Sequence, residues 1–135
     1  MLTPYSMCGI IGIFGKKEPA ARRSQALKMA ASIRHRGPDW SGIYSDDYAL
    51  LAHERLSIVD VEHGAQPLYD TTKGRVLIAN GEIYDHQQLR TTLKKEHQWQ
   101  TKSDCEVLLY LYEEQGPEFV SKIDGIFAFC IYDQT

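Results

Sequence analysis

Three cysteines, Cys8, Cys105 and Cys130, carry the most nucleophilic side chains of this 135-residue sequence. Their odd number, with no CxxC pair and no zinc pattern among the five scattered histidines, predicts neither a disulfide scaffold nor a metal site. Cys130 lies in an apolar run and Cys105 in the first turn of an expected helix, so we interpret both as structural thiols. Cys8, close to the N-terminus, remains the candidate nucleophile.

Six short segments, one of them around Cys8, carry the residues that could form a site. In chain order they are Met7–Gly12 (MCGIIG), Arg34–Asp39 (RHRGPD), Ala52–Asp60 (AHERLSIVD), Gly64–Leu68 (GAQPL), Asn80–Tyr84 (NGEIY) and Ser103–Glu106 (SDCE). Their order and spacing resemble the glutaminase domain of class II glutamine amidotransferases, and within that class the glutamine-hydrolysing asparagine synthetases. The resemblance extends from Met7 to Asp133, which is essentially the whole chain.

The resemblance makes Cys8 the nucleophile. In such a domain the cysteine is N-terminal, because a free α-amine with a pKa of about 8 can accept the thiol proton at neutral pH. Its thiolate would attack the side-chain carboxamide of L-glutamine, release ammonia and leave a thioester that water hydrolyses to glutamate. The resemblance assigns stabilisation of the oxyanion to the Asn80 side-chain amide and the Gly81 backbone N–H. Taken alone, Asn-Gly would be a plain hairpin turn.

Glutamine also carries an α-carboxylate and an α-ammonium group, which a selective pocket must neutralise. Arg55 can hold a carboxylate through two parallel hydrogen bonds, and the resemblance gives it this role. It assigns the ammonium to Glu82 and Asp104. Taken singly, each of these three residues would be a surface ion-pair partner. We expect His53 to be structural, because the family needs no histidine base.

The resemblance implies an α+β fold, a four-layer αββα sandwich of two antiparallel sheets covered by helices, of the N-terminal nucleophile hydrolase type. Residues 1–6 are expected to be an extension or to lie upstream of the true start, since Cys8 needs a free α-amine. Residues 7–135 would be the glutaminase domain, incomplete at its C-terminus.

The implied parent enzyme has a synthetase domain that uses ATP and Mg²⁺ to amidate aspartate, and that domain is absent from this sequence. No glycine-rich nucleotide loop occurs here, so we expect no cofactor in this chain. The resemblance also allows a homodimer of the parent enzyme.

Two other interpretations stay open. The chain could serve another class II amidotransferase, such as one that feeds amino-sugar or purine synthesis, although residues 34–39 and 53–58 favour the asparagine synthetases. It could also be a truncated, non-catalytic domain that acts only as a binding module. An electrophilic glutamine analogue separates that module from an enzyme, because labelling requires an intact pocket and a nucleophilic thiol.

Hydrophobic periodicity supplies the elements that must position these residues. Apolar runs predict strands at 8–14, 48–53, 75–79 and 126–132, and the helical period predicts helices at 20–34 and 85–97, with another opening at a capping box formed by Ser103 and Glu106. Residues 35–42 are expected to be a loop and residues 57–70 to be irregular. Strands that are apolar on both faces need cover on both sides, which predicts packed sheets with helices outside.

Composition and charge exclude several classes of partner. Fifteen Lys and Arg residues against 18 Asp and Glu residues give a net charge of −3, which provides no general attraction for nucleic acid. No apolar run approaches the roughly 18 residues of a membrane span, and residues 1–6 do not resemble a secretory signal. We therefore expect a cytoplasmic protein that binds neither nucleic acid nor membranes.

Overall fold

A computed structural model describes residues 8–15, 18–37, 40–55, 65–70 and 74–135. One antiparallel sheet has the strand order β1-β3-β2 and the other the order β4-β5-β6. The strands are β1 (Gly9–Phe14), β2 (Trp40–Ser45), β3 (Ala49–Arg55), β4 (Leu68–Asp70), β5 (Arg75–Ile83) and β6 (Gly125–Asp133). The α-helices are α1 (Pro19–Ile33), α2 (His86–Thr92) and α3 (Val107–Gln115), and the 3-10 helices are η1 (Arg34–Arg36), η2 (Asp104–Glu106) and η3 (Gly116–Lys122).

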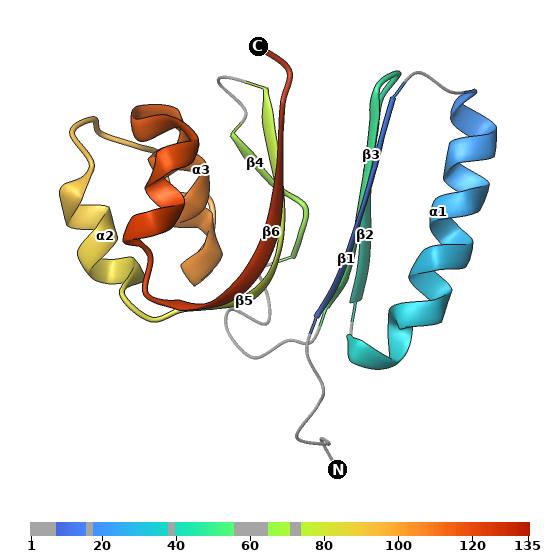
Figure 1. The fold of residues 1–135 in the computed structure, drawn as a ribbon, viewed down its shortest axis with the longest axis horizontal. Coiled ribbons are helices and arrows are strands. Elements are labelled where there is room, and N and C mark those ends of the chain that lie inside the picture. The colour runs from blue at the N-terminus through green and yellow to red at the C-terminus, as the bar shows by residue number, and fades with distance from the viewer. Residues whose placement is uncertain (1–7, 16–17, 38–39, 56–64, 71–73) are drawn as a thin grey trace.

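The two sheets face each other, and helices cover their outer faces (Figure 1). Helix α1 lies against the sheet that contains β1, and α2 and α3 lie against the sheet that contains β5. This arrangement is the αββα sandwich of two antiparallel sheets that the resemblance implied. The alternation of buried side chains along β3 shows why it forms: Leu50 packs toward α1, whereas Leu51 packs toward Val76 and Ile78 of the other sheet.

Three clusters of apolar side chains hold the four layers together. The outer cluster under α1 contains Ile11, Ala26, Ala30, Leu50 and Ala52, and the cluster between the sheets is built on Leu51, Val76 and Ile78. The largest cluster joins α3 to the β5 sheet and includes Leu77, Leu108, Leu109, Leu111 and Phe119. Small side chains on α1 allow that helix to lie close to its sheet.

Two segments that were expected to be irregular contain strands, and one strand is longer than expected. The expected loop at 35–42 contains the start of β2, and the expected irregular segment at 57–70 contains β4, while residues 56–64 lie outside the described residues. Strand β5 does not stop at Ala79 but continues through Asn80-Gly81 to Ile83. Strand pairing with distant segments decides these cases, and local turn propensity does not report it.

The start of α2 has no side-chain cap, and the segment before α3 differs in detail from the expected capping box. Asp85 stands at the N-cap position of α2, but its side chain accepts the backbone N–H of Asp124 (3.2 Å) instead of capping the helix. Ser103 accepts the N–H of Cys105 (3.3 Å), as expected of a cap. Glu106 does not complete the predicted capping box, because its buried carboxylate binds residues 100 and 101 instead.

Candidate active site

The ends of several strands meet at one end of the sandwich. In the register of β1 and β3, Gly9 lies opposite Glu54, so Cys8, the residue before β1, and Arg55, the last residue of β3, lie at the same end of this pair. The second half of β5 reaches that end as well, where the chain leaves the sheet for α2 (Figure 1). Segments that are more than 40 residues apart in sequence thereby become neighbours.

Cys105 connects three of the expected site segments. Its Sγ lies 4.0 Å from the carbonyl oxygen of Gly81, and its thiol interacts electrostatically with Cys8. Burial raises the pKa of the Cys105 thiol, and the adjacent carboxylate of Asp104 raises it further. The thiol is therefore protonated at neutral pH, and it can serve as a weak donor to Gly81 rather than as a nucleophile. This agrees with the structural role expected of Cys105.

Asp104 holds the end of β5. Its Oδ2 accepts the backbone N–H of Ile83 at 2.7 Å. Residue 104 is thereby fixed beside the Asn80-Gly81-Glu82 segment, although η2 lies 21 residues further along the chain. The Glu82 side chain is exposed and Asp104 is partly buried, so both carboxylates are accessible from solvent at this end of the molecule.

Gly81 is a position where only glycine fits. Its φ is +149°, and an added Cβ would lie 2.1 Å from the carbonyl oxygen of Ile126 and 2.5 Å from the Cα of Phe127. Glycine is therefore required because the backbone of β6 lies close to this residue, whether or not a substrate also approaches it. The expected Asn-Gly motif lies inside a strand, so the hairpin interpretation is wrong at this position.

His53 joins the two sheets next to the motif. Its side chain is buried, and Nε2 lies 3.0 Å from the carbonyl oxygen of Ala79, the residue before Asn80. A carbonyl oxygen can only accept, so this ring nitrogen carries the hydrogen. The contact is consistent with the structural role expected of His53.

The backbone of Arg55 closes β3 opposite Trp40, while the Arg55 side chain lies outside what the structure describes. The structure thus places Cys8, the Arg55 backbone, the Asn80-Gly81-Glu82 segment and Asp104 at the same end of the sandwich.

Residues 7–135 match the glutamine amidotransferase domain family. The chain belongs to this family. The matched segment includes all six candidate site residues, and the described fold provides the two sheets and the covering helices that the resemblance implied.

This amidotransferase domain is similar to curated asparagine synthetases. It is 58% identical over 128 residues to asparagine synthetase B [glutamine-hydrolyzing] of Escherichia coli (strain K12). The matched residues make up 94% of this chain and 23% of that protein. It is 50% identical over 128 residues to asparagine synthetase [glutamine-hydrolyzing] 2 of Oryza sativa subsp. japonica, covering 94% of this chain and 22% of the relative. A probable asparagine synthetase [glutamine-hydrolyzing] of Dictyostelium discoideum is 47% identical over 131 residues, at 95% and 24% coverage. The chain thus spans about a quarter of the length of these relatives.

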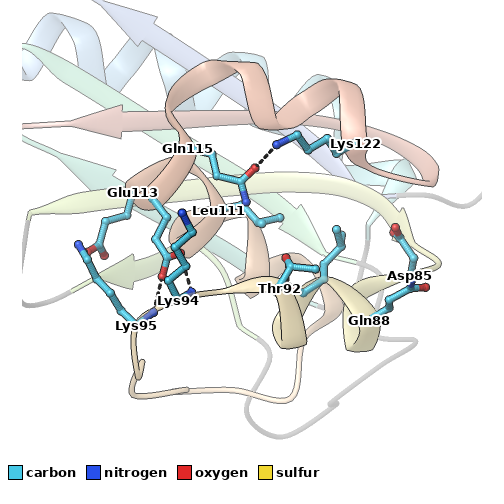
Figure 2. Close-up of a pocket in the computed structure, with 11 residues that line it drawn as sticks. Asp85, Gln88, Thr92, Lys94, Lys95, Leu111, Glu113, Gln115 and Lys122 are labelled. Atoms are coloured by element: carbon cyan, nitrogen blue, oxygen red, sulfur yellow. Dashed lines mark hydrogen bonds and ion pairs between the residues drawn. The ribbon is translucent and has the colours of Figure 1, made fainter.

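A separate cavity of about 620 Å³ lies between α2, α3 and η3 of the amidotransferase domain (Figure 2). None of the six candidate site residues lines it. Charged and amide side chains that line the cavity bind one another: Lys95 pairs with Glu113 (3.2 Å), and Lys122 donates a hydrogen bond to Gln115 (2.8 Å). The cavity is therefore not part of the candidate active site.

Among the described residues of this amidotransferase domain, no cluster of three or more His, Cys, Asp or Glu side chains is arranged to hold a metal ion. In the same segments no helix is both long enough and apolar enough to cross a membrane.

Gln66 lies in one of the segments that carry the resemblance, but the sequence pattern indicated no role for it. Its side chain is buried and binds the backbone of Ala79, next to Asn80. The available signal was its position two residues before Leu68, the apolar residue that begins β4.

Proposed function

We propose that this chain is a glutaminase domain that hydrolyses L-glutamine to glutamate and ammonia, with Cys8 as the nucleophile. The observation that carries the proposal is that three distant motif segments meet at one end of the sandwich: Cys8 precedes β1 where β3 ends, and the Cys105 Sγ, next to Asp104, lies 4.0 Å from the carbonyl oxygen of Gly81. The family match over residues 7–135 supports the same reaction class.

The proposed reaction starts with transfer of the Cys8 thiol proton to its own α-amine. The thiolate attacks the carboxamide carbon of glutamine, and the carbonyl π electrons move to the oxygen. The Asn80 side-chain amide and the Gly81 N–H stabilise this oxyanion in the proposal. When it collapses, the C–N bond breaks and the α-ammonium gives its proton to the leaving nitrogen, which departs as ammonia. A γ-glutamyl thioester remains on Cys8.

Water completes the proposed cycle. The α-amine of Cys8 takes a proton from the water as its oxygen attacks the thioester carbon, and the same two donors stabilise the second oxyanion. Cleavage of the C–S bond then releases glutamate, and the sulfur regains the proton. One group therefore serves as base and acid in both halves of the reaction.

Recognition of the amino-acid end of glutamine is proposed for three charged residues. Arg55 would bind the α-carboxylate, and Glu82 and Asp104 would bind the α-ammonium group. The proposal is supported by the placement of the Arg55 backbone, Glu82 and Asp104 at one end of the sandwich.

The relatives favour asparagine synthesis as the use of the ammonia. We propose that the parent enzyme passes ammonia to a synthetase domain outside this chain, where ATP and Mg²⁺ activate aspartate. A cytoplasmic location and a homodimer of the parent enzyme belong to the same proposal. Detection of ammonia transfer to an acceptor other than aspartate would instead assign the domain to another amidotransferase.

The proposed mechanism requires a free α-amine on Cys8, because an amide nitrogen in mid-chain is not basic. Only a form of the protein that begins at Cys8 should therefore hydrolyse glutamine. Steady turnover by protein whose intact mass includes Met1 would contradict this requirement.

The decisive experiment compares the full chain with the same chain cleaved immediately before Cys8. Each is treated with a diazoketone analogue of glutamine and followed by intact mass, with a Cys8→Ser variant as the control. We expect one covalent adduct on Cys8 of the cleaved form, slowed by L-glutamine but not by D-glutamine. Absence of labelling in folded, cleaved protein would favour the non-catalytic binding module.

A further inference from the structure

We propose that Gln66 is a positioning residue that holds Asn80 and Gly81 in place for stabilisation of the oxyanion. The inference rests on the proposed glutaminase function. Its basis is a pair of hydrogen bonds between one side chain and one residue of the backbone. The N–H of Ala79 donates to Gln66 Oε1 at 2.6 Å, and Gln66 Nε2 donates to the carbonyl oxygen of Ala79 at 3.1 Å.

The Gln66 carboxamide takes the place of a missing strand residue. Strand β4 begins at Leu68, which lies opposite Leu77 in the antiparallel register with β5. Two residues further along the same register, Gln66 would lie opposite Ala79. A carboxamide carries the same donor and acceptor as a peptide group, so the side chain continues the ladder where the backbone of β4 does not.

Without this side chain, the Ala79 N–H would lose its hydrogen-bond partner, and the Ala79 carbonyl oxygen would keep only His53 Nε2. Ala79 is 1% exposed, so water cannot replace both bonds. An unsatisfied buried backbone group costs about 1–3 kcal/mol, which makes this edge of β5 sensitive to residue 66. The loss would fall directly on the residue before Asn80.

Peptide planarity carries the effect from Ala79 to Asn80. The carbonyl of Ala79 shares a rigid plane with the nitrogen and Cα of Asn80. Hydrogen bonds that hold this carbonyl therefore also hold the backbone nitrogen and Cα of Asn80. Two donors from different layers fix this carbonyl, Gln66 Nε2 and His53 Nε2. On its other edge Asn80 lies opposite Ala128 of β6, and Gly81 lies opposite Phe127.

Gln66 is itself held from the opposite sheet. It is 9% exposed, and its carbonyl oxygen lies so close to Gly42 of β2 that a Cβ there would be 1.9 Å away. Glycine inside β2 is therefore explained by the passage of the Gln66 backbone. The Gln66 backbone therefore packs against β2 while its side chain binds β5, so contacts on both sides fix the orientation of the side chain.

The test uses the full chain cleaved before Cys8, with two substitutions of Gln66 and one control. Gln66→Met keeps the length but removes both hydrogen bonds, whereas Gln66→Glu keeps an acceptor for the Ala79 N–H and places a second oxygen against the Ala79 carbonyl. Gln25→Met, on the exposed face of α1, makes the same chemical change away from the site. Where Gln66→Met does not fold, Gln66→Glu carries the test.

Two measurements are made on each variant. Nuclear magnetic resonance without substrate reports the Ala79 and Gly81 amides and the side-chain NH₂ of Asn80, assigned with an Asn80→Asp variant. Steady-state kinetics reports kcat and KM for glutamine. We expect these resonances to shift in both Gln66 variants, and kcat to fall by about 10- to 100-fold with KM changed by less than about threefold. Gln25→Met should match the wild type in both measurements.

Unchanged Asn80 and Gly81 resonances in a folded Gln66 variant would overturn the positioning role, as would an unchanged kcat. A rise in KM with constant kcat would also overturn it, because that result would place Gln66 in substrate binding. If wild-type protein does not hydrolyse glutamine but the resonances still shift, the proposed function fails while the positioning of Asn80 stands.

Discussion

The carboxylate of Asp104 accepts the backbone N–H of Ile83 at 2.7 Å and so anchors the end of β5 to the start of the α3 region. The same carboxylate is the proposed partner of the substrate ammonium. One side chain would thus combine a local structural contact with a binding charge. The two contributions can be separated, because an amide oxygen can replace the first but not the second.

We predict that Asp104→Asn and Asp104→Ala differ in stability but share a binding defect. Asparagine retains an oxygen for the Ile83 N–H, so its unfolding free energy should exceed that of the alanine variant by about 1–2 kcal/mol. Both variants lose the negative charge, and KM for glutamine should rise by about tenfold or more. Urea unfolding and steady-state kinetics of the cleaved protein measure these two effects.

Asp47→Asn is the matched control, since Asp47 is exposed on the turn between β2 and β3 at the other end of the sandwich. This substitution should change neither the unfolding free energy nor the KM for glutamine. A normal KM in Asp104→Asn would remove this residue from ammonium binding.

Gly81→Ala is predicted to be strongly destabilising. The new Cβ would lie 2.1 Å from the carbonyl oxygen of Ile126 in β6, and the positive φ adds strain. Overpacking and strain together should lower the unfolding free energy by about 3 kcal/mol or more. Adduct formation at Cys8 should slow as well, because β5 must move away from β6.

The Gly116→Ala variant separates the effect of backbone strain from the effect of the contact with β6. Gly116 also has a positive φ, +66°, but a Cβ there would meet nothing within 4 Å. Its cost should be about 1 kcal/mol, from backbone strain alone. Equal losses in the two variants would show that the contact with β6 contributes nothing.

Cys105 is predicted to be far less reactive than Cys8 in the folded, cleaved protein. Burial and the Asp104 carboxylate raise the pKa of the Cys105 thiol, so its thiolate fraction at pH 8 is small. Alkylation by iodoacetamide, mapped by mass spectrometry, should be slower at Cys105 than at Cys8 by about tenfold or more. In urea the two rates should converge. Rapid native alkylation of Cys105 would contradict its structural role.

We predict that Glu114 stabilises the folded domain and that this stabilisation is lost in acid. Burial alone would raise its pKa, but hydrogen bonds from the Lys94 N–H, the His97 ring and the Lys95 N–H lower the pKa from its ordinary 4.5 to about 2. Because the folded pKa is the lower one, this contribution is fully present above about pH 5 and is lost as pH falls toward 2.

Glu114→Gln should therefore lower the unfolding free energy by about 2 kcal/mol at pH 7, and the difference from wild type should shrink toward pH 2.5. Chemical unfolding at several pH values measures it. Glu118→Gln, at an exposed position of η3, should follow the wild-type curve throughout. A difference between wild type and Glu114→Gln that stays constant with pH would contradict the lowered pKa.

Most helices and strands of this domain could be predicted from neighbouring residues. Apolar runs predicted β1, β3 and β6 nearly to their ends, and the helical period predicted α1. The ordered motifs also predicted which residues would share a site. These features follow from local backbone preferences and from hydrophobic periodicity, which the sequence displays directly.

Other features depend on contacts across long sequence distances. The Asn80-Gly81 dipeptide has the composition of a turn, yet pairing with β6 makes it part of a strand. Gln66 looks like an ordinary loop residue until the register of β4 and β5 places its amide against Ala79.

The sequence by itself thus determined the family, the main elements and the candidate nucleophile Cys8. Only the tertiary structure decided which neighbours hold the candidate donors Asn80 and Gly81. The physical reason is that a backbone group is satisfied by whatever reaches it in space, and Gln66, His53 and β6 reach this segment from three different parts of the chain.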